Sequence, residues 1–238
     1  MTQRSADPAT RSQGTCHLCA QIAGDPAGDL LRRHLGFDDY RRALCGETAE
    51  FAVIPSIGPL VPGHVLLTPK RHVRSFVGLS AQERKSGDDV ARRMAGDLVT
   101  IFGQPVHGFE HGSSRCGSTI ACSVEHAHLH LVPADVEVWP LIENAGSWTE
   151  LGSTSLAAVA GDREYLLYEH PDGTRLIWIT NEAPIPSQFM RRAFATALGT
   201  PHLWDWRRDP RPEEIRTTLS CLSDVELCAD RAGERVSA

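Results

Sequence analysis

The sequence has no long hydrophobic run and no excess of positive charge, and these absences exclude broad classes of function. No stretch of its 238 residues approaches the roughly 18 to 20 apolar residues of a membrane-spanning helix. The first 15 residues lack the apolar core of a signal peptide. The formal net charge of −6 is not that of a general nucleic-acid-binding surface. We therefore expect a cytoplasmic protein with neither a membrane nor a nucleic acid as partner.

The cysteines are odd in number and argue against a disulfide framework. There are seven of them in a chain without a secretory signal, which favours free thiols or metal ligands. Cys16 and Cys19 form a Cys-x-x-Cys pair, the common spacing for two thiolates on one tetrahedral ion. No second such pair exists, so histidines would have to complete the site, with His72 and one histidine of the segment 126–130 as candidates. The alternative is a small buried apolar pair of thiols.

Apolar and turn patterns predict an α+β fold dominated by an antiparallel sheet. Short apolar runs separated by Pro, Gly and Asp predict two strand pairs, 51–55 with 64–69 and 163–169 with 174–180. A capping-box pattern at Ser80 and Glu83 begins a long helix over about 80–102, whose apolar residues fall at helical spacing and would cover one sheet face. Two further helices are predicted, one capped by Ser187 and one near 212–222.

Three histidines on alternate positions are the most informative feature. In EHAHLHLVP, residues 125–133, an extended strand would project His126, His128 and His130 from one side and apolar residues from the other. Leucine, valine and a closing proline favour a strand over a helix here. An exposed polar face is the alternative, but three histidines in register favour a function.

With these residues assembled, the sequence resembles the histidine-triad (HIT) superfamily, whose signature is His-φ-His-φ-His-φ-φ, with φ apolar. The upstream segment PGHVLLTPKRHV, residues 62–73, resembles the companion strand of that family. The resemblance implies a HIT-like catalytic domain over residues 14–140. The polar, aperiodic composition of residues 1–13 predicts a disordered tail. The family pattern does not explain the C-terminal part, which we expect to be an α/β extension over 141–238 packed on the core. The resemblance is closest in character to the zinc-bearing Hint-like and galactose-1-phosphate uridylyltransferase-related branch, and it implies a homodimer.

The resemblance also implies a role for each site residue. A structural Zn²⁺ would be held by four residues: Cys16, Cys19, His72 and His126. His128 would attack phosphorus to form a covalent nucleotidyl-histidine, and His130 would contact the phosphate or the leaving group. Ser123 and His64 would also contact the substrate. The third triad position is Gln in the uridylyltransferase branch, so His130 favours hydrolysis over transfer.

Several positions depart from the pattern of the family and leave the substrate open. Ser56 stands about where relatives of the Hint type carry an acidic residue that binds ribose hydroxyls, and Cys122 replaces a small residue or Gln. Glu110 and His111 have no assigned functional role. The alternative is that each is a loop residue that pairs with solvent or with Arg115. The nucleoside pocket is therefore rewritten, or is supplied by the extension.

Two motifs of the extension each allow two alternative interpretations. Trp204 and Trp206, with Arg207 and Arg208, would either anchor the extension to the core or stack a base and neutralise phosphates. The helix that carries Arg191 and Arg192 would either point charge at an anion or be a capped surface helix.

The resulting hypothesis is a HIT-type hydrolase. It would cleave a phosphoanhydride, phosphoester or phosphoramidate bond of a small nucleotide-like substrate. The alternatives are a nucleotidyltransferase or phosphorylase of the same fold and a non-catalytic nucleotide-binding protein.

Overall fold

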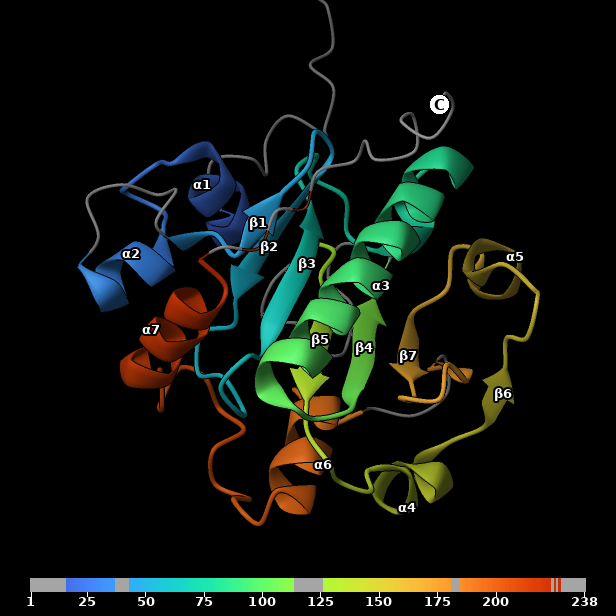
Figure 1. Ribbon diagram of the computed structural model, residues 1–238. Coiled ribbons are helices and arrows are strands. Elements are labelled where there is room, and N and C mark those ends of the chain that lie inside the picture. Colours follow the sequence, from blue (N-terminus) through green and yellow to red (C-terminus); the bar gives the residue numbers. More distant parts are fainter. Residues whose placement is uncertain are drawn as a thin grey trace, which may run out of the picture.

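The computed structural model describes residues 16–36, 43–113, 126–180, 185–223, 225 and 227. Its described strands form one eight-stranded sheet in the order β1-β2-β3-β5-β4-β7-β8-β6, and every neighbouring pair is antiparallel (Figure 1). The strands are β1 (Gly46–Glu47), β2 (Phe51–Pro55), β3 (Val65–Pro69), β4 (Val106–Gly112), β5 (Leu129–Pro133), β6 (Trp148–Glu150), β7 (Tyr165–Glu169) and β8 (Arg175–Ile179). The helices are α1 (His17–Ala23), α2 (Leu30–Leu35), α3 (Ala81–Phe102), α4 (Trp139–Ile142), α5 (Leu156–Ala160), α6 (Phe189–Ala197) and α7 (Pro212–Cys221), with 3-10 turns η3 (Phe76–Gly78) and η4 (Glu143–Ala145). The predicted α+β class is confirmed.

The long helix α3 covers one face of the sheet, as its apolar spacing predicted (Figure 1). Ser80 accepts from the backbone N–H of Glu83, whose side chain accepts from the backbone N–H of Ser80, so the predicted capping box is present. Val90, Met94 and Leu98 pack against alternate strand residues such as Leu67, Leu129, Leu131 and Leu167. This interface forms the larger of the hydrophobic clusters.

The opposite face of the sheet is covered by segments from both ends of the chain. Met190 and Phe194 of α6 pack on Phe109, Leu166 and Tyr168, and Leu18 of α1 packs on Ile54 and Leu66. Successive residues of a strand point to opposite faces, so these contacts complement those of α3. The site described below lies on this second face.

The C-terminal extension continues the sheet of the core. β7 pairs with β4 over Gly108–Gly112, and β8 and β6 follow outward. Both predicted strand pairs, β2 with β3 and β7 with β8, are confirmed. α7 returns to the other end of the sheet, where Thr218 Oγ1 accepts from the backbone N–H of Gly63 at 2.9 Å.

Two local predictions were wrong. The regular strand of the triad begins at Leu129, because only residues 129–131 pair with β3, and His126 and His128 precede it. Ser187 does not cap α6: the helix begins after Gln188, which has a left-handed backbone (φ 58°) and gives no side-chain cap. The helix is held by its buried face instead.

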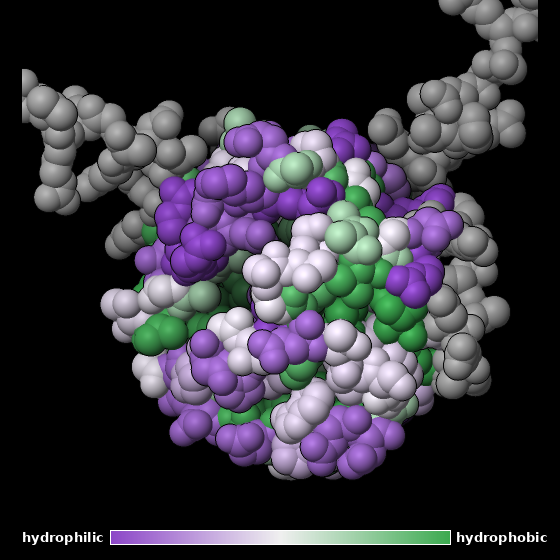
Figure 2. All heavy atoms as spheres, turned by 90° about the vertical axis from the view of Figure 1, so that its right-hand side faces the viewer, coloured by the Kyte–Doolittle hydropathy of each residue, from purple (hydrophilic) through white to green (hydrophobic). Residues whose placement is uncertain are grey.

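The side of the molecule that carries α5 and β6 has a mixed surface with a hollow in it (Figure 2). A cavity lies on this side between α3 and the sheet, and Glu110 of β4, Glu169 of β7 and Arg84 of α3 are among its lining residues. No helix in the described part of the chain combines the length and the apolarity needed to cross a membrane.

Candidate functional site

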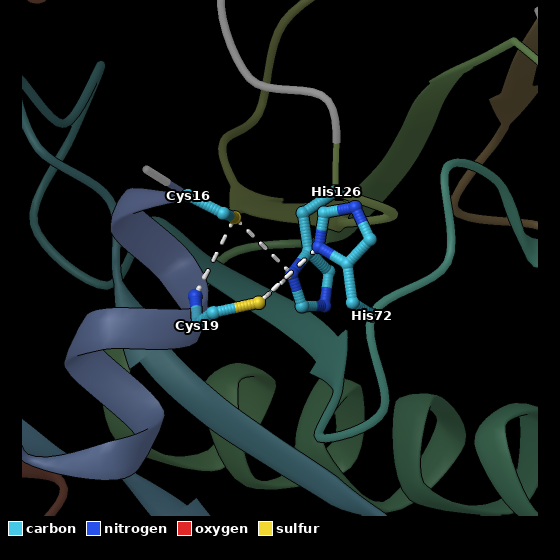
Figure 3. A group of neighbouring side chains, drawn as sticks. All are labelled: Cys16, Cys19, His72 and His126. Carbon is cyan, nitrogen blue, oxygen red and sulfur yellow. Dashed lines mark hydrogen bonds between the residues drawn. The ribbon is translucent and has the colours of Figure 1, made fainter. Parts of the chain in front are cut away.

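Four metal-binding side chains meet at the start of α1. Cys16 is the N-cap residue of α1 and Cys19 lies in its first turn. His72 comes from the loop after β3, and His126 from the residues just before β5 (Figure 3). Their sulfur and nitrogen atoms all lie within 4.8 Å of one another. The group could therefore hold a metal ion, and it joins three segments that are far apart in the sequence.

The distances in this group suit one tetrahedral ion. Cys19 Sγ lies 3.2 Å from His72 Nδ1 and 3.3 Å from His126 Nδ1, and Cys16 Sγ lies 3.5 Å from His126 Nδ1. Sulfur and nitrogen ligands of one tetrahedral zinc ion are about 3.5 Å apart, given bond lengths of about 2.3 and 2.0 Å. Hydrogen bonding from the Cys19 side chain holds the pKa of the Cys16 thiol well below its ordinary value. The donor set is thus close to its ligating geometry.

His126 is oriented for ligation by a second hydrogen bond. Its Nε2–H donates to the carbonyl of Pro69 at 2.8 Å. With the proton held on Nε2, the Nδ1 lone pair faces the two thiols. The ring is almost completely buried, so it is fixed by packing as well as by this bond.

His128 lines a neighbouring cavity on the second face of the sheet. Its Nδ1–H donates to the carbonyl of His126 at 2.7 Å, which leaves Nε2 as the unprotonated nitrogen. Among the described residues Nε2 has no hydrogen-bond partner. Burial lowers the pKa of His128 to about 4, so the ring is neutral near pH 7. The arrangement presents an imidazole lone pair to the cavity without a separate base.

His64 and His130 form a hydrogen-bonded pair whose tautomers are set by the backbone. The N–H of Leu60 donates to His64 Nδ1 at 3.1 Å, so His64 must carry its proton on Nε2. That Nε2–H donates to His130 Nδ1 at 2.8 Å, which leaves the proton of His130 on its own Nε2. Burial lowers the pKa of both rings well below the ordinary value and keeps them neutral. His130 therefore offers an N–H donor. Phe109 stacks on the His130 ring, with 4.1 Å between the ring centroids, and fixes the plane of that ring.

Of the residues predicted to contact the substrate, some line the cavity and others do not. His128 and His130 line the cavity, with rings 4.9 Å apart. His64 is completely buried behind His130, with both ring nitrogens engaged. Ser123, Arg115 and Cys122 lie outside the described residues.

The extension supplies part of the cavity wall. Residues 188–191 of the loop and helix, together with Trp206, line the same cavity as His128 and His130. Trp204 packs into the second hydrophobic cluster, and Arg192 stacks on it at 3.3 Å. Trp204 thus packs the extension onto the core, whereas Trp206 lines the cavity, and base stacking by Trp206 stays a prediction.

Glu110 and His111 are not loop residues, which corrects the sequence interpretation. Both belong to β4 and point to opposite faces of the sheet. Glu110 accepts from the backbone N–H of Phe76 and from the hydroxyl of Tyr165, at 2.9 and 2.6 Å. His111 lines the cavity of His128 and lies 2.7 Å from a carboxylate oxygen of Glu164. The run GFEHG contained too little apolar alternation for a strand prediction.

Comparison with known proteins places a family domain on the central part of the chain. Residues 40–137, less than half of the chain, match the HIT domain. No curated protein sequence matches the chain.

Similar solved structures include three HIT proteins, each aligned over about half of this chain. A HIT family protein from Bacillus subtilis is 20% identical, with 50% of this chain and 72% of that chain covered and a TM-score of 0.38. A histidine triad nucleotide-binding protein from Sulfolobus tokodaii is 17% identical, with 50% and 68% covered and a TM-score of 0.38. A Zn-bound histidine triad family protein from Mycobacterium smegmatis is 23% identical, with 51% and 76% covered and a TM-score of 0.38. Residues 40–137, which include His64, His72 and the whole triad, therefore match the HIT domain, whereas Cys16, Cys19 and the extension lie outside the match.

Proposed function

We propose that the chain is a HIT-type hydrolase that cleaves a phosphoanhydride, phosphoester or phosphoramidate bond of a nucleotide-like substrate. The observation that carries this proposal is the state of His128. Its Nδ1–H is held by the carbonyl of His126, its Nε2 has no partner among the described residues, and the residue lines the cavity. A neutral imidazole held in this way is a nucleophile at neutral pH.

The reaction proceeds in two displacements at phosphorus. Nε2 of His128 attacks, the bond from phosphorus to the leaving group breaks, and the leaving group departs with that electron pair. The imidazolium that forms keeps its Nδ1 proton, and the carbonyl of His126 at 2.7 Å stabilises this positive charge. Water then attacks phosphorus, the P–N bond breaks, and His128 regains its lone pair. One proton of the water stays on the new phosphate oxygen, and the other passes through solvent to the departed leaving group.

His130 is proposed to donate from Nε2 to an oxygen of the phosphorus group, where negative charge develops. His64 acts through His130, since its Nε2–H fixes the tautomer that makes His130 a donor. His64 is therefore a positioning residue. Ser123 stays the predicted hydroxyl contact to the phosphate.

The metal group is proposed to hold a structural Zn²⁺. Two thiolates and two imidazoles make a closed set of four ligands without an open position, so the ion when bound supplies structural cross-linking. His126 has two roles in this arrangement. Its ring belongs to the metal group and its carbonyl holds His128, so fixing the ring also fixes the nucleophile.

The strand order of the sheet limits which strands could form the predicted homodimer. β4 has β5 on one side and β7 on the other, so no partner strand can pair with it. A dimer formed through the sheet would have to use β1 or β6, which end the sheet of the described residues. Light scattering on the purified chain would give a mass twice that of the chain if it dimerises.

Intact-protein mass spectrometry tests the proposed chemistry. The wild type, His128→Gly and the control His202→Gly, which alters an exposed histidine, would be mixed with diadenosine polyphosphates, adenosine phosphoramidate and nucleotide sugars, and quenched at mildly basic pH. A nucleotidyl adduct is expected on the wild type and on His202→Gly, and none on His128→Gly. Turnover by His128→Gly would refute the role of His128. A nucleotide that binds but is never consumed would indicate a binding protein, and product that requires an added acceptor would indicate a transferase.

A further inference from the structure

A buried arginine from the extension faces the cavity of His128. Arg191 is the third residue of α6, its side chain is almost completely buried, and it lines the same cavity as His128 and His130. Its three hydrogen bonds to described residues all go to neutral acceptors. Nε donates to the carbonyl of Trp204 at 2.9 Å, one terminal nitrogen donates to Ser56 Oγ at 3.3 Å, and the other donates to the carbonyl of Gly58.

The positive charge of Arg191 has no paired carboxylate among the residues that the structure describes. No Asp or Glu oxygen of the described residues lies within 4.0 Å of its guanidinium. The carboxylate of Asp205 favours the charged form of Arg191 from a longer distance, and the guanidinium of Arg211 disfavours it. A buried charge destabilises the fold unless hydrogen bonds or an opposite charge replace the hydration that it has lost. Arg191 also keeps two of its five N–H groups without an acceptor among the described residues.

Two neighbouring amide groups are also unmatched. Gln21 Nε2 and Gln188 Oε1 are buried and have no hydrogen-bond partner within the described part of the chain, and both residues line this cavity. Gln188 holds its position with a left-handed backbone, a conformation that costs a non-glycine residue free energy. Buried polar groups are normally paired, and a ligand in the cavity is one source of the missing partners. A donor amide, an acceptor amide and a guanidinium thus belong to residues that line this cavity.

We propose that Arg191, with Ser56 beside it, binds a second anionic group of the substrate, apart from the phosphorus group that His128 attacks. The substrate class is then a nucleotide with an additional phosphate or carboxylate. This inference rests on the proposed function. A guanidinium with two free N–H groups suits such a group because it donates two parallel hydrogen bonds to its oxygens. Ser56 is short enough to leave that space open and supplies no competing negative charge.

Titration calorimetry at fixed ionic strength tests this inference. The ligands are adenosine 5′-monophosphate, adenosine 2′,5′-bisphosphate, adenosine 3′,5′-bisphosphate and adenylosuccinate, which carries carboxylates on its base. The wild type is expected to bind at least one of the three ligands with an additional anionic group about tenfold more tightly than the monophosphate. The pattern among the three identifies a phosphate on the ribose or a carboxylate on the base.

Matched variants assign the preference to Arg191. Arg191→Met should reduce it to less than twofold, whereas Arg192→Met should leave it unchanged, because Arg192 stacks on Trp204 and does not line the cavity. Ser56→Asp provides a second variant if Arg191→Met does not fold. Its carboxylate would pair with the guanidinium and remove the preference by occupying the free N–H groups.

Two results would overturn the inference. One is equal affinity of the wild type for all four ligands, and the other is a preference that persists in both Arg191→Met and Ser56→Asp. If a nucleotidyl adduct on His128 forms without any preference, this inference fails and the proposed function stands. If no nucleotide binds and no adduct forms, both fail.

Discussion

Glu110 makes the stability of this protein depend on pH in a direction opposite to that of most carboxylates. Its side chain is 1% exposed on the α3 side of the sheet. It accepts two hydrogen bonds, from Phe76 N–H and from the hydroxyl of Tyr165. Burial outweighs these bonds and raises the pKa of Glu110 from 4.5 to about 7. The charge of Glu169 acts in the same direction as burial, and that of His111 opposes it.

The sign and the size of the effect follow from these two pKa values. Between pH 4.5 and 7 the folded state keeps a proton on Glu110 that the unfolded state releases. The free energy of unfolding therefore falls as pH rises through this window. One pKa unit corresponds to about 1.4 kcal/mol, so the loss attributable to Glu110 is about 3 kcal/mol, and it is complete above pH 7.

Urea denaturation at a series of pH values would measure this effect in wild type and Glu110→Gln. The amide has nearly the same shape, can accept from Phe76 N–H and can donate to Tyr165, but it does not titrate. We expect the stability of the wild type relative to Glu110→Gln to fall by about 3 kcal/mol between pH 4.5 and 8. Glu213→Gln, which alters an exposed carboxylate, should show no comparable change. A constant difference between wild type and Glu110→Gln over this range would refute the reasoning.

Further predictions concern the metal group and the packing of β4. His126→Ala removes one of four ligands, so the zinc content by mass spectrometry and the melting temperature should both fall, whereas His128→Ala should keep the metal and the fold. Equal zinc content in wild type and His126→Ala would contradict the ligand assignment. Gly112→Ala should cost about 1–3 kcal/mol in chemical denaturation, because the new Cβ would lie 2.2 Å from Cζ of Tyr165. Gly96→Ala in α3 meets nothing within 4 Å and should stabilise by about 0.5–1 kcal/mol. A neutral Gly112→Ala would show that β4 and β7 pack less closely than described.

The sequence by itself determined the elements whose signals are local. The capping box of α3, the antiparallel pairs β2 with β3 and β7 with β8, and the assignment of the fold class all follow from residues close together in the chain. The four candidate metal ligands were also named from the sequence, through a resemblance to a family, and the structure brings them within 4.8 Å of one another. These patterns are readable because periodicity, caps and turns depend on neighbouring residues.

Tertiary structure alone decided which distant segments meet. The pairing of β4 with β7 makes one sheet of the core and the extension, and it encloses Glu110 between them. The contact of Ser56 with Arg191 joins residues 135 positions apart, and the bond from His64 to His130 joins residues 66 apart. The sequence indicates that an apolar side chain needs a packing partner or that a polar one needs a hydrogen-bond partner, but many residues of the chain could serve as that partner. Only the packing of the whole chain selects one of them, and here it placed a buried cation from the extension beside the histidines of the core.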